Sequence, residues 1–216
     1  MCLILVAWRK SESNPLVVAA NRDEFHGRPA APAAFWEDRP GILAGRDLEA
    51  RGTWMGVSRG GKFAAVTNYR GAREPRAAES RGALVARFLE NGEAAAPYVD
   101  KIRGSAYSGF NLLACDGEEL WWTSNRGGQP RRLAPGIYGL GNALIDAPEV
   151  DPSKQRFASV LAAGAAVEPL FTVLAEARIV NPVYGTRCST VSIGRRYAER
   201  SFAPDGSELD TLRYEF

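Results

Sequence analysis

The first 23 residues hold two apolar runs with a short polar connection between them. Residues 2–9 (CLILVAWR) and 16–23 (LVVAANRD) are rich in aliphatic and β-branched side chains, whereas residues 11–15 (SESNP) are polar. Apolar runs of this length joined by turn residues are typical of a β-hairpin. The pattern therefore predicts that the end of the second strand lies beside the start of the first.

The next stretch, residues 25–50, is rich in Pro, Arg and Ala and has no clear period, which predicts a long loop. Residues 52–58 and 62–69 are β-like runs on either side of a glycine turn, so they predict a second hairpin. Residues 71–80 are polar and predict another loop.

Helical spacing follows over residues 80–92, where Ser80 is placed as the N-cap and Gly92 lies past the end. A short second helix is expected to start at Pro97. Residues 151–164 and 167–178 predict two further helices. Further strands are expected at the positions listed here: 109–115, 119–125, 136–142, 185–193, 196–202 and 207–216.

The order of these elements is strands, two helices, strands, two helices, strands. It lacks the alternation of strand and helix that a parallel sheet requires, so it predicts an α+β protein built from antiparallel hairpins. No repeat and no linker divides the chain. We expect a single domain over residues 1–216.

The composition is that of a soluble globular protein, with 45% hydrophobic and 24% charged residues. A net charge of +2 does not favour a nucleic-acid partner. Only four of the 27 basic residues are Lys, and Ala and Gly are abundant. This bias resembles GC-rich coding and predicts a bacterial source.

Three cysteines without C-x-x-C spacing do not suggest a disulfide framework, which favours a reducing compartment. A single histidine, His26, makes a His-based metal site improbable, and no metal is expected. No run approaches the ~18 apolar residues of a membrane span. The charges at Arg9 and Lys10 follow the first apolar run, whereas a signal peptide places them before it. These observations predict a cytoplasmic protein.

Two short motifs lack the context that their chemistry needs. Residues 56–60 (GVSRG) match the G-x-S-x-G nucleophile elbow, but a strand follows instead of a helix and the histidine lies upstream. Residues 56–62 have the outline of a phosphate-binding loop, but Phe63 stands where Ser or Thr is required. We interpret this stretch as a hairpin turn.

Cys2 is the position with the strongest chemical potential. Removal of the initiator Met would leave a thiol and a free α-amine on one carbon. An α-amine of pKa about 7.7–8.0 can accept the thiol proton near neutral pH, so nucleophilic catalysis would need no histidine. The alternative is that Cys2 is a small hydrophobic residue that begins a buried strand.

A polar cluster ends the second strand. Because neighbours on a strand alternate faces, Asn21 and Asp23 would share one face, and Arg22 and Glu24 the other. The predicted hairpin brings this cluster next to Cys2, where a carboxylate would hold the amine and a guanidinium would favour the thiolate. A salt bridge at the sheet edge explains the cluster equally well.

Acyl transfer also needs donors for the developing oxyanion. Asn68 and Asn142 end apolar strands and are candidates, although ordinary turns use asparagine as well. Arg187, at the start of a late strand, is a candidate for charge in the pocket, and its alternative is a surface arginine.

Cys2 followed in order by NRDE, GTW, TNYR, SRG, GFNLL, GLGN and YGTRCSTV resembles the NRDE family, also called the transport and Golgi organization 2 family. The resemblance covers residues 1 to about 195. That family is similar to cysteine N-terminal-nucleophile hydrolases such as penicillin V acylases and conjugated bile acid hydrolases. This implies an αββα four-layer sandwich, in which two antiparallel sheets are covered by helix pairs.

The resemblance also implies roles. Cys2 would be nucleophile and base, Asp23 and Arg22 would contact it, Asn68 and Asn142 would stabilise the oxyanion, and Arg187 would be the late arginine. Three further motif positions, Asn21, Trp54 and Tyr69, are candidate binding residues.

Two functions follow. One is an amidohydrolase that cleaves a linear amide of a small-molecule substrate without a cofactor. The alternative is a non-catalytic carrier of haem, acyl-CoA or lipid on the same fold, in which Cys2 and His26 could be axial ligands. The sequence does not specify the substrate or the oligomeric state.

Overall fold

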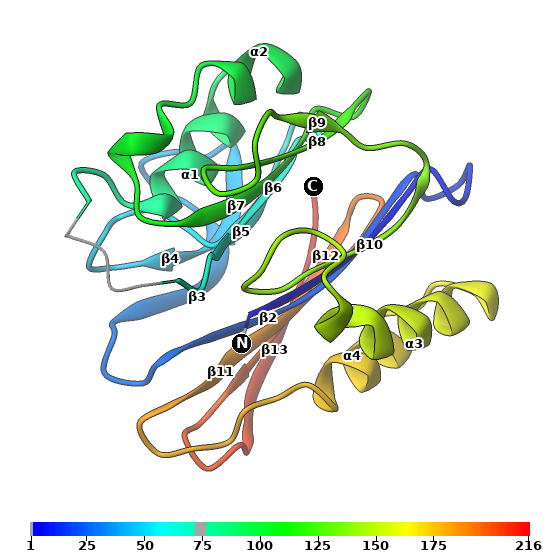
Figure 1. Ribbon diagram of the computed structural model, residues 1–216. Helices are drawn as coiled ribbons and strands as arrows, with labels where there is room; N and C mark the ends of the chain where they lie inside the picture. Colours follow the sequence, from blue (N-terminus) through cyan, green and yellow to red (C-terminus); the bar gives the residue numbers. More distant parts are fainter. Residues whose placement is uncertain (1, 72–76) are drawn as a thin grey trace. The chain divides into compact units, whose positions relative to one another are not determined.

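The computed structural model describes residues 2–71 and 77–216. The chain folds into two compact units (Figure 1). Unit 1 contains residues 2–28, 135–141 and 145–216, and unit 2 contains residues 29–71, 77–134 and 142–144. Met1 and the middle of the predicted loop 71–80, residues 72–76, lie outside the described residues. The expectation of one domain over residues 1–216 stays a prediction.

Unit 1 is built on a six-stranded sheet in the order β10-β1-β2-β11-β12-β13, and every neighbouring pair in it is antiparallel. Its strands are β1 (Leu3–Trp8), β2 (Leu16–Phe25), β10 (Gly136–Leu140), β11 (Tyr184–Ile193), β12 (Arg196–Phe202) and β13 (Glu208–Glu215). The predicted hairpin of residues 2–23 is confirmed, because β1 and β2 pair antiparallel from Leu3↔Asn21 to Trp8↔Leu16.

Two helices, α3 (Asp151–Ala162) and α4 (Val167–Ala175), follow a short 3-10 turn and pack on one face of this sheet. Alternate residues of the strands form the core under these helices, because neighbours on a strand point to opposite faces of the sheet. It contains every second residue of β1 and of the first half of β2, together with the apolar stripe of α4. Those residues are Leu3, Leu5, Ala7, Val17, Ala19, Leu170, Phe171, Val173 and Leu174.

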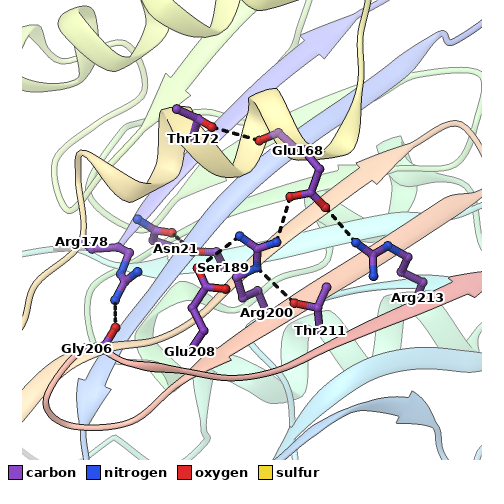
Figure 2. A network of polar contacts seen from close by, with 10 residues as sticks. All are labelled: Asn21, Glu168, Thr172, Arg178, Ser189, Arg200, Gly206, Glu208, Thr211 and Arg213. Carbon is purple, nitrogen blue, oxygen red and sulfur yellow. Dashed lines mark hydrogen bonds and ion pairs between the residues drawn. The ribbon is translucent and has the colours of Figure 1, made fainter.

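Ion pairs attach α4 to the outer strands of the same sheet. Glu168, in the first turn of α4, accepts hydrogen bonds from Arg200 of β12 at 2.9 Å and from Arg213 of β13 at 2.8 Å (Figure 2). The Arg200 guanidinium also lies 4.4 Å from the centroid of the Phe171 ring. A carboxylate in the first turn is favoured by the helix dipole as well, so the contacts fix the start of α4.

Unit 2 is built on a seven-stranded antiparallel sheet in the order β3-β4-β5-β6-β7-β8-β9. Its strands are β3 (Ala30–Phe35), β4 (Ile42–Asp47), β5 (Met55–Ser58), β6 (Phe63–Asn68), β7 (Phe110–Cys115), β8 (Leu120–Ser124) and β9 (Arg131–Arg132). The hairpin interpretation of GVSRG is confirmed, because β5 and β6 are joined by a turn in which Gly61 has φ 87°.

Helices α1 (Arg81–Glu90) and α2 (Ala95–Asp100), with the 3-10 turn Gly104–Ala106, pack with this sheet around one buried cluster. The apolar positions predicted for the first helix, Leu84, Val85, Phe88 and Leu89, are all in that cluster. Helix α2 begins at Ala95, two residues before the expected start at Pro97.

The termini of α1 lie where the sequence predicts them, but their hydrogen bonds differ from the usual capping pattern. Ser80 is the N-cap residue but its side chain makes no capping hydrogen bond, and Asn91, not a glycine in the left-handed region, caps the C-terminus. The C-terminal carbonyl groups instead receive hydrogen bonds from the Lys62 ammonium, 3.3 Å from the Phe88 oxygen and 2.6 Å from the Asn91 oxygen. A cation at this end is also favoured by the helix dipole. Gly92 follows the C-cap residue Asn91, so it lies past the end of the helix as predicted.

The prediction of a loop over residues 25–50 is wrong, because β3 and β4 lie inside it. Strand β3 was not predicted because its sequence contains proline, which is uncommon in strands. It is the edge strand of its sheet, and its pairing with β4 shifts register between Ala31 and Ala34, around Pro32. Proline is tolerated on edge strands and at bulges because no ladder partner needs its missing N–H. The two-residue strand β9 was also not expected.

Two glycines explain why the motifs GTW and SRG occur together. A Cβ on Gly52 would lie 2.5 Å from the Gly82 carbonyl carbon, and a Cβ on Gly82 would lie 2.9 Å from the Thr53 oxygen. The backbone before β5 therefore touches the backbone of the first turn of α1, and any side chain at either glycine would separate them.

No helix among the described residues is long and apolar enough to cross a membrane.

We expect Lys62→Met to destabilise the protein by about 1–3 kcal/mol, because the carbonyl groups at the end of α1 lose a charged donor. Urea unfolding followed by circular dichroism measures this change. Lys101→Met is the matched control, since Lys101 is an exposed lysine whose ion pair with Glu93 should contribute little. Equal stability of both variants would contradict a capping role for Lys62.

Candidate functional site

The site begins with the position of Cys2 at the start of β1. Since Leu3 pairs with Asn21, the residue before Leu3 reaches the end of β2. The Cys2 Sγ lies 3.6 Å from the backbone oxygen of Asp23, to which the thiol donates a hydrogen bond. The hairpin therefore brings Cys2 and the NRDE segment together, as predicted.

The charges around the Cys2 thiol oppose one another. Burial raises the pKa of the Cys2 thiol above its ordinary value, and the negative charge of Asp23 raises it further. The positive charge of Arg22 acts in the opposite direction. A thiol in this environment stays protonated near neutral pH, so it needs a proton acceptor to become a nucleophile.

Asp23 and Arg22 occupy opposite faces of β2, as the alternation predicts. Asp23 shares its face with Asn21, which pairs with the core residue Leu3. Nevertheless the charges of both Asp23 and Arg22 act on the Cys2 thiol. Cys2 precedes the first residue of β1, so its side chain is not confined to one face of the sheet.

Asn21 has a buried, fully engaged side chain. Its Nδ2 donates to the Leu174 oxygen near the end of α4, at 2.9 Å. Its Oδ1 accepts from the Ser189 hydroxyl at 2.6 Å (Figure 2). These contacts join the helix to β2 and β11. A binding role for Asn21 stays a prediction.

Two residues of β11 that the sequence analysis did not single out contact Asp23. The Thr186 hydroxyl donates to the Asp23 carboxylate at 2.6 Å, and the Tyr184 hydroxyl donates to the Asp23 backbone oxygen at 3.2 Å. That oxygen is the one that accepts from the Cys2 thiol. Both residues lie in the YGTR segment, so the motif itself was the available signal, but only the pairing of β11 with β2 shows its purpose.

A β-bulge makes these contacts possible. The pairing shifts register between Thr186 and Cys188, so that Thr186 pairs with Asp23 and Ser189 with Asn21. The two β2 residues are two apart and share a face, whereas the two β11 residues are three apart. One extra residue, Arg187, restores the match, which is how a bulge re-aims the side chains that follow it.

Arg187 contacts the turn that follows β2. Its Nη1 donates to the backbone oxygens of Phe25 at 3.0 Å, His26 at 3.3 Å and Arg28 at 3.1 Å. Burial lowers the pKa of Arg187, and the nearby charge of Arg22 lowers it further. The arginine thus organises the backbone beside the NRDE segment, and a direct role on the substrate stays a prediction.

The candidate asparagines both belong to unit 2, where they contact each other. The Asn142 Nδ2 donates to the backbone oxygen of Asn68 at 2.8 Å, and the Arg70 amide donates to the Asn142 backbone oxygen at 2.7 Å. The Tyr69 amide donates to the Gly109 oxygen at 2.9 Å. The Asn68 side chain is exposed and that of Asn142 is half-buried. Their roles, and that of Tyr69, stay predictions.

Two other motif positions have structural contacts in unit 2. The Trp54 ring lies on the backbone of Gly45, where a Cβ would come within 2.3 Å of the ring. Asn111 of the GFNLL motif is fully buried and donates to the Ala143 oxygen at 2.9 Å, which holds the segment after Asn142. A ligand contact for Trp54 stays a prediction.

The residues described contain no cluster of three or more His, Cys, Asp or Glu side chains suited to a metal ion. The His26 Nε2 lies 3.0 Å from the Asn181 backbone oxygen. The carrier alternative stays a prediction.

Several solved structures share the fold of this chain. They include a Caenorhabditis elegans N-acylethanolamine-hydrolyzing acid amidase ortholog, with a TM-score of 0.59 over 89% of this chain and 93% of that chain at 12% identity. The C2A mutant of conjugated bile acid hydrolase from Clostridium perfringens has a TM-score of 0.63 over 100% and 97% of the two chains at 8% identity. These likenesses confirm the predicted α+β fold with two antiparallel sheets.

Curated relatives are found in animals. A transport and Golgi organization protein 2 homolog of Bos taurus is 36% identical, covering 93% of this chain and 92% of the relative. The Homo sapiens homolog is 34% identical over the same shares. Animal relatives contradict the prediction of a bacterial source, which was wrong because the choice of Arg over Lys on a solvated surface is not set by the fold.

The family model described as Transport and Golgi organisation 2 matches residues 1–182. With that match and these relatives, the chain belongs to the transport and Golgi organisation 2 family.

Proposed function

We propose that this chain is an N-terminal-cysteine amidohydrolase that acts on a linear amide after removal of Met1. The observation that carries the proposal is the contact between the Cys2 thiol and the Asp23 backbone oxygen, where the start of β1 lies beside the end of β2. The fold supports it, because the chain is similar in fold to an acid amidase, a penicillin V acylase and a conjugated bile acid hydrolase. At 8–12% identity these likenesses support the fold, and the chemistry rests on the residues.

The first half-reaction would acylate Cys2. The α-amine of Cys2 takes the thiol proton, and the sulfur forms a bond to the carbonyl carbon while the carbonyl π electrons move to oxygen. When the carbonyl re-forms, the C–N bond breaks, and the ammonium of Cys2 returns its proton to the departing nitrogen. A thioester on Cys2 and a free amine are the products.

The second half-reaction would restore the enzyme. The α-amine takes a proton from water, whose oxygen attacks the thioester carbon. The C–S bond breaks, the proton returns to sulfur, and a carboxylic acid leaves. No oxidant, metal or cofactor is needed for this sequence of steps.

Asp23 and Arg22 have complementary parts in this proposal. An ionised Asp23 stabilises the protonated amine that forms in each half-reaction, whereas it opposes the thiolate. Arg22 favours the thiolate and offsets part of that penalty. In unit 2, Asn142 uses one of its two amide hydrogens on the Asn68 backbone oxygen.

Intact-mass measurement of the purified protein tests whether the nucleophile exists. We expect loss of Met1 and, with a penicillin V or activated-acyl probe, a single adduct that peptide mapping assigns to Cys2. Cys2→Ala should form no adduct. Cys115 and Cys188 are buried, so they serve as internal controls. Retention of Met1, or no adduct at high probe concentration, would refute the proposal.

Asp23→Asn should separate thiol ionisation from catalysis. The asparagine keeps an oxygen that accepts from Thr186 but removes the negative charge that raises the pKa of Cys2. That pKa should fall, so the thiolate fraction at pH 8 rises, and iodoacetamide should alkylate Cys2 several-fold faster. Hydrolysis should slow at least tenfold, because the ammonium loses its counter-ion.

Glu24→Gln is the matched control for Asp23→Asn. Glu24 is the next residue, lies on the other face of β2, and forms an ion pair with Arg28 at 4.0 Å. Both alkylation and hydrolysis should stay within about twofold of the unmodified protein. Slower alkylation of Asp23→Asn would show that Asp23 does not act on the thiol through its charge.

A further inference from the structure

Thr186 has a hydroxyl whose orientation is fixed by its two neighbours. The Thr186 Oγ1 lies 2.6 Å from the Asp23 Oδ1, and the Ile179 amide donates to the same Oγ1 at 2.9 Å. A hydroxyl has only one hydrogen, and the Ile179 N–H can only donate. The Thr186 hydrogen must therefore point at the Asp23 carboxylate.

The backbone of Thr186 is held by the same partner. Its amide donates to the Ile179 oxygen at 2.9 Å, so the two residues exchange hydrogen bonds. A Cβ on the preceding residue, Gly185, would lie 2.7 Å from that oxygen, which explains the glycine in the YGTR motif. Thr186 is 3% exposed and Asp23 is 4% exposed, so water does not compete for this contact.

We propose that Thr186 is a positioning residue, which fixes the Asp23 carboxylate for its task beside Cys2. This inference rests on the proposed function, because Asp23 acts there as counter-ion to the Cys2 amine. The chain of contacts runs from the Ile179 amide through the Thr186 hydroxyl to the carboxylate, and from the Asp23 backbone oxygen to the Cys2 thiol. The bulge at Arg187 is what brings Thr186 onto the face of Asp23.

A hydroxyl that merely satisfies a buried polar group would affect stability alone. The hydrogen bond also holds the carboxylate where its negative charge raises the pKa of the Cys2 thiol. Its loss should therefore change how the reaction depends on pH, which a purely structural role would not do. This difference makes the proposal testable.

The test compares Thr186→Val with Thr186→Ser and with Thr190→Val. Valine removes the donor, whereas serine restores a hydroxyl. Thr190 is a buried threonine of the same strand whose hydroxyl lies 3.4 Å from Glu199 instead of Asp23, so it controls for loss of a buried hydroxyl on β11. Unfolding curves identify any variant that does not fold.

We expect Thr186→Val to acylate Cys2 with the penicillin V probe about tenfold more slowly, as loss of a hydrogen bond to a charged group implies. The pH profile of Cys2 alkylation by iodoacetamide should move to lower pH, because a displaced carboxylate no longer raises the pKa of the Cys2 thiol. Thr186→Ser should return both rate and profile toward those of the unmodified protein. Thr190→Val should keep the profile unchanged.

A measurement that does not need activity separates this inference from the proposed function. Alkylation of Cys2 by iodoacetamide needs no turnover, and in Thr186→Val its pH profile should move toward that of Asp23→Asn. If it does while no protein forms an acyl adduct with the penicillin V probe, the proposed function is wrong but Thr186 still positions Asp23. If neither the alkylation profile nor the acylation rate changes in a folded Thr186→Val protein, the positioning role is overturned.

Discussion

The arrangement of the candidate site depends on the register of three adjacent strands, β1, β2 and β11. β2 lies between the other two, so its end receives Cys2 from one side and Thr186 from the other. Register in a sheet with a buried face is strongly constrained, because a shift of one residue would expose the core residues of the whole strand. The packing of α3 and α4 on this sheet therefore also fixes where the thiol and the carboxylate meet.

That constraint explains how Asp23 acts at two points at once. Its backbone oxygen belongs to the strand and cannot turn, and it accepts from both Cys2 and Tyr184. Its carboxylate is a side-chain group and needs Thr186 to fix it. The backbone oxygen of Asp23 thus sets the position of the Cys2 thiol. The charge of the Asp23 carboxylate affects the ionisation of the same thiol.

The sequence predicted the parts of this arrangement that depend on local pattern. The hairpin between β1 and β2 followed from apolar runs and a turn, and the alternation of Asp23 and Arg22 followed from strand geometry. The bulge at Arg187 was beyond reach, because it arises from pairing between segments about 160 residues apart. Strand β3 was missed for a related reason. Its proline is tolerated because β3 is an edge strand, and which strand lies at the edge is decided by the pairing of the whole sheet.

The Lys62 ammonium at the end of α1 has a consequence for how unit 2 assembles. Lys62 directly precedes β6, so the cation at the end of the helix comes from a residue almost 30 positions earlier in the chain. Helix and hairpin therefore complete each other, and the last helical turn cannot gain its full protection before the neighbouring sheet is in place. The last turn of α1 and the β5–β6 hairpin should therefore open together, so hydrogen exchange of their amides should be correlated.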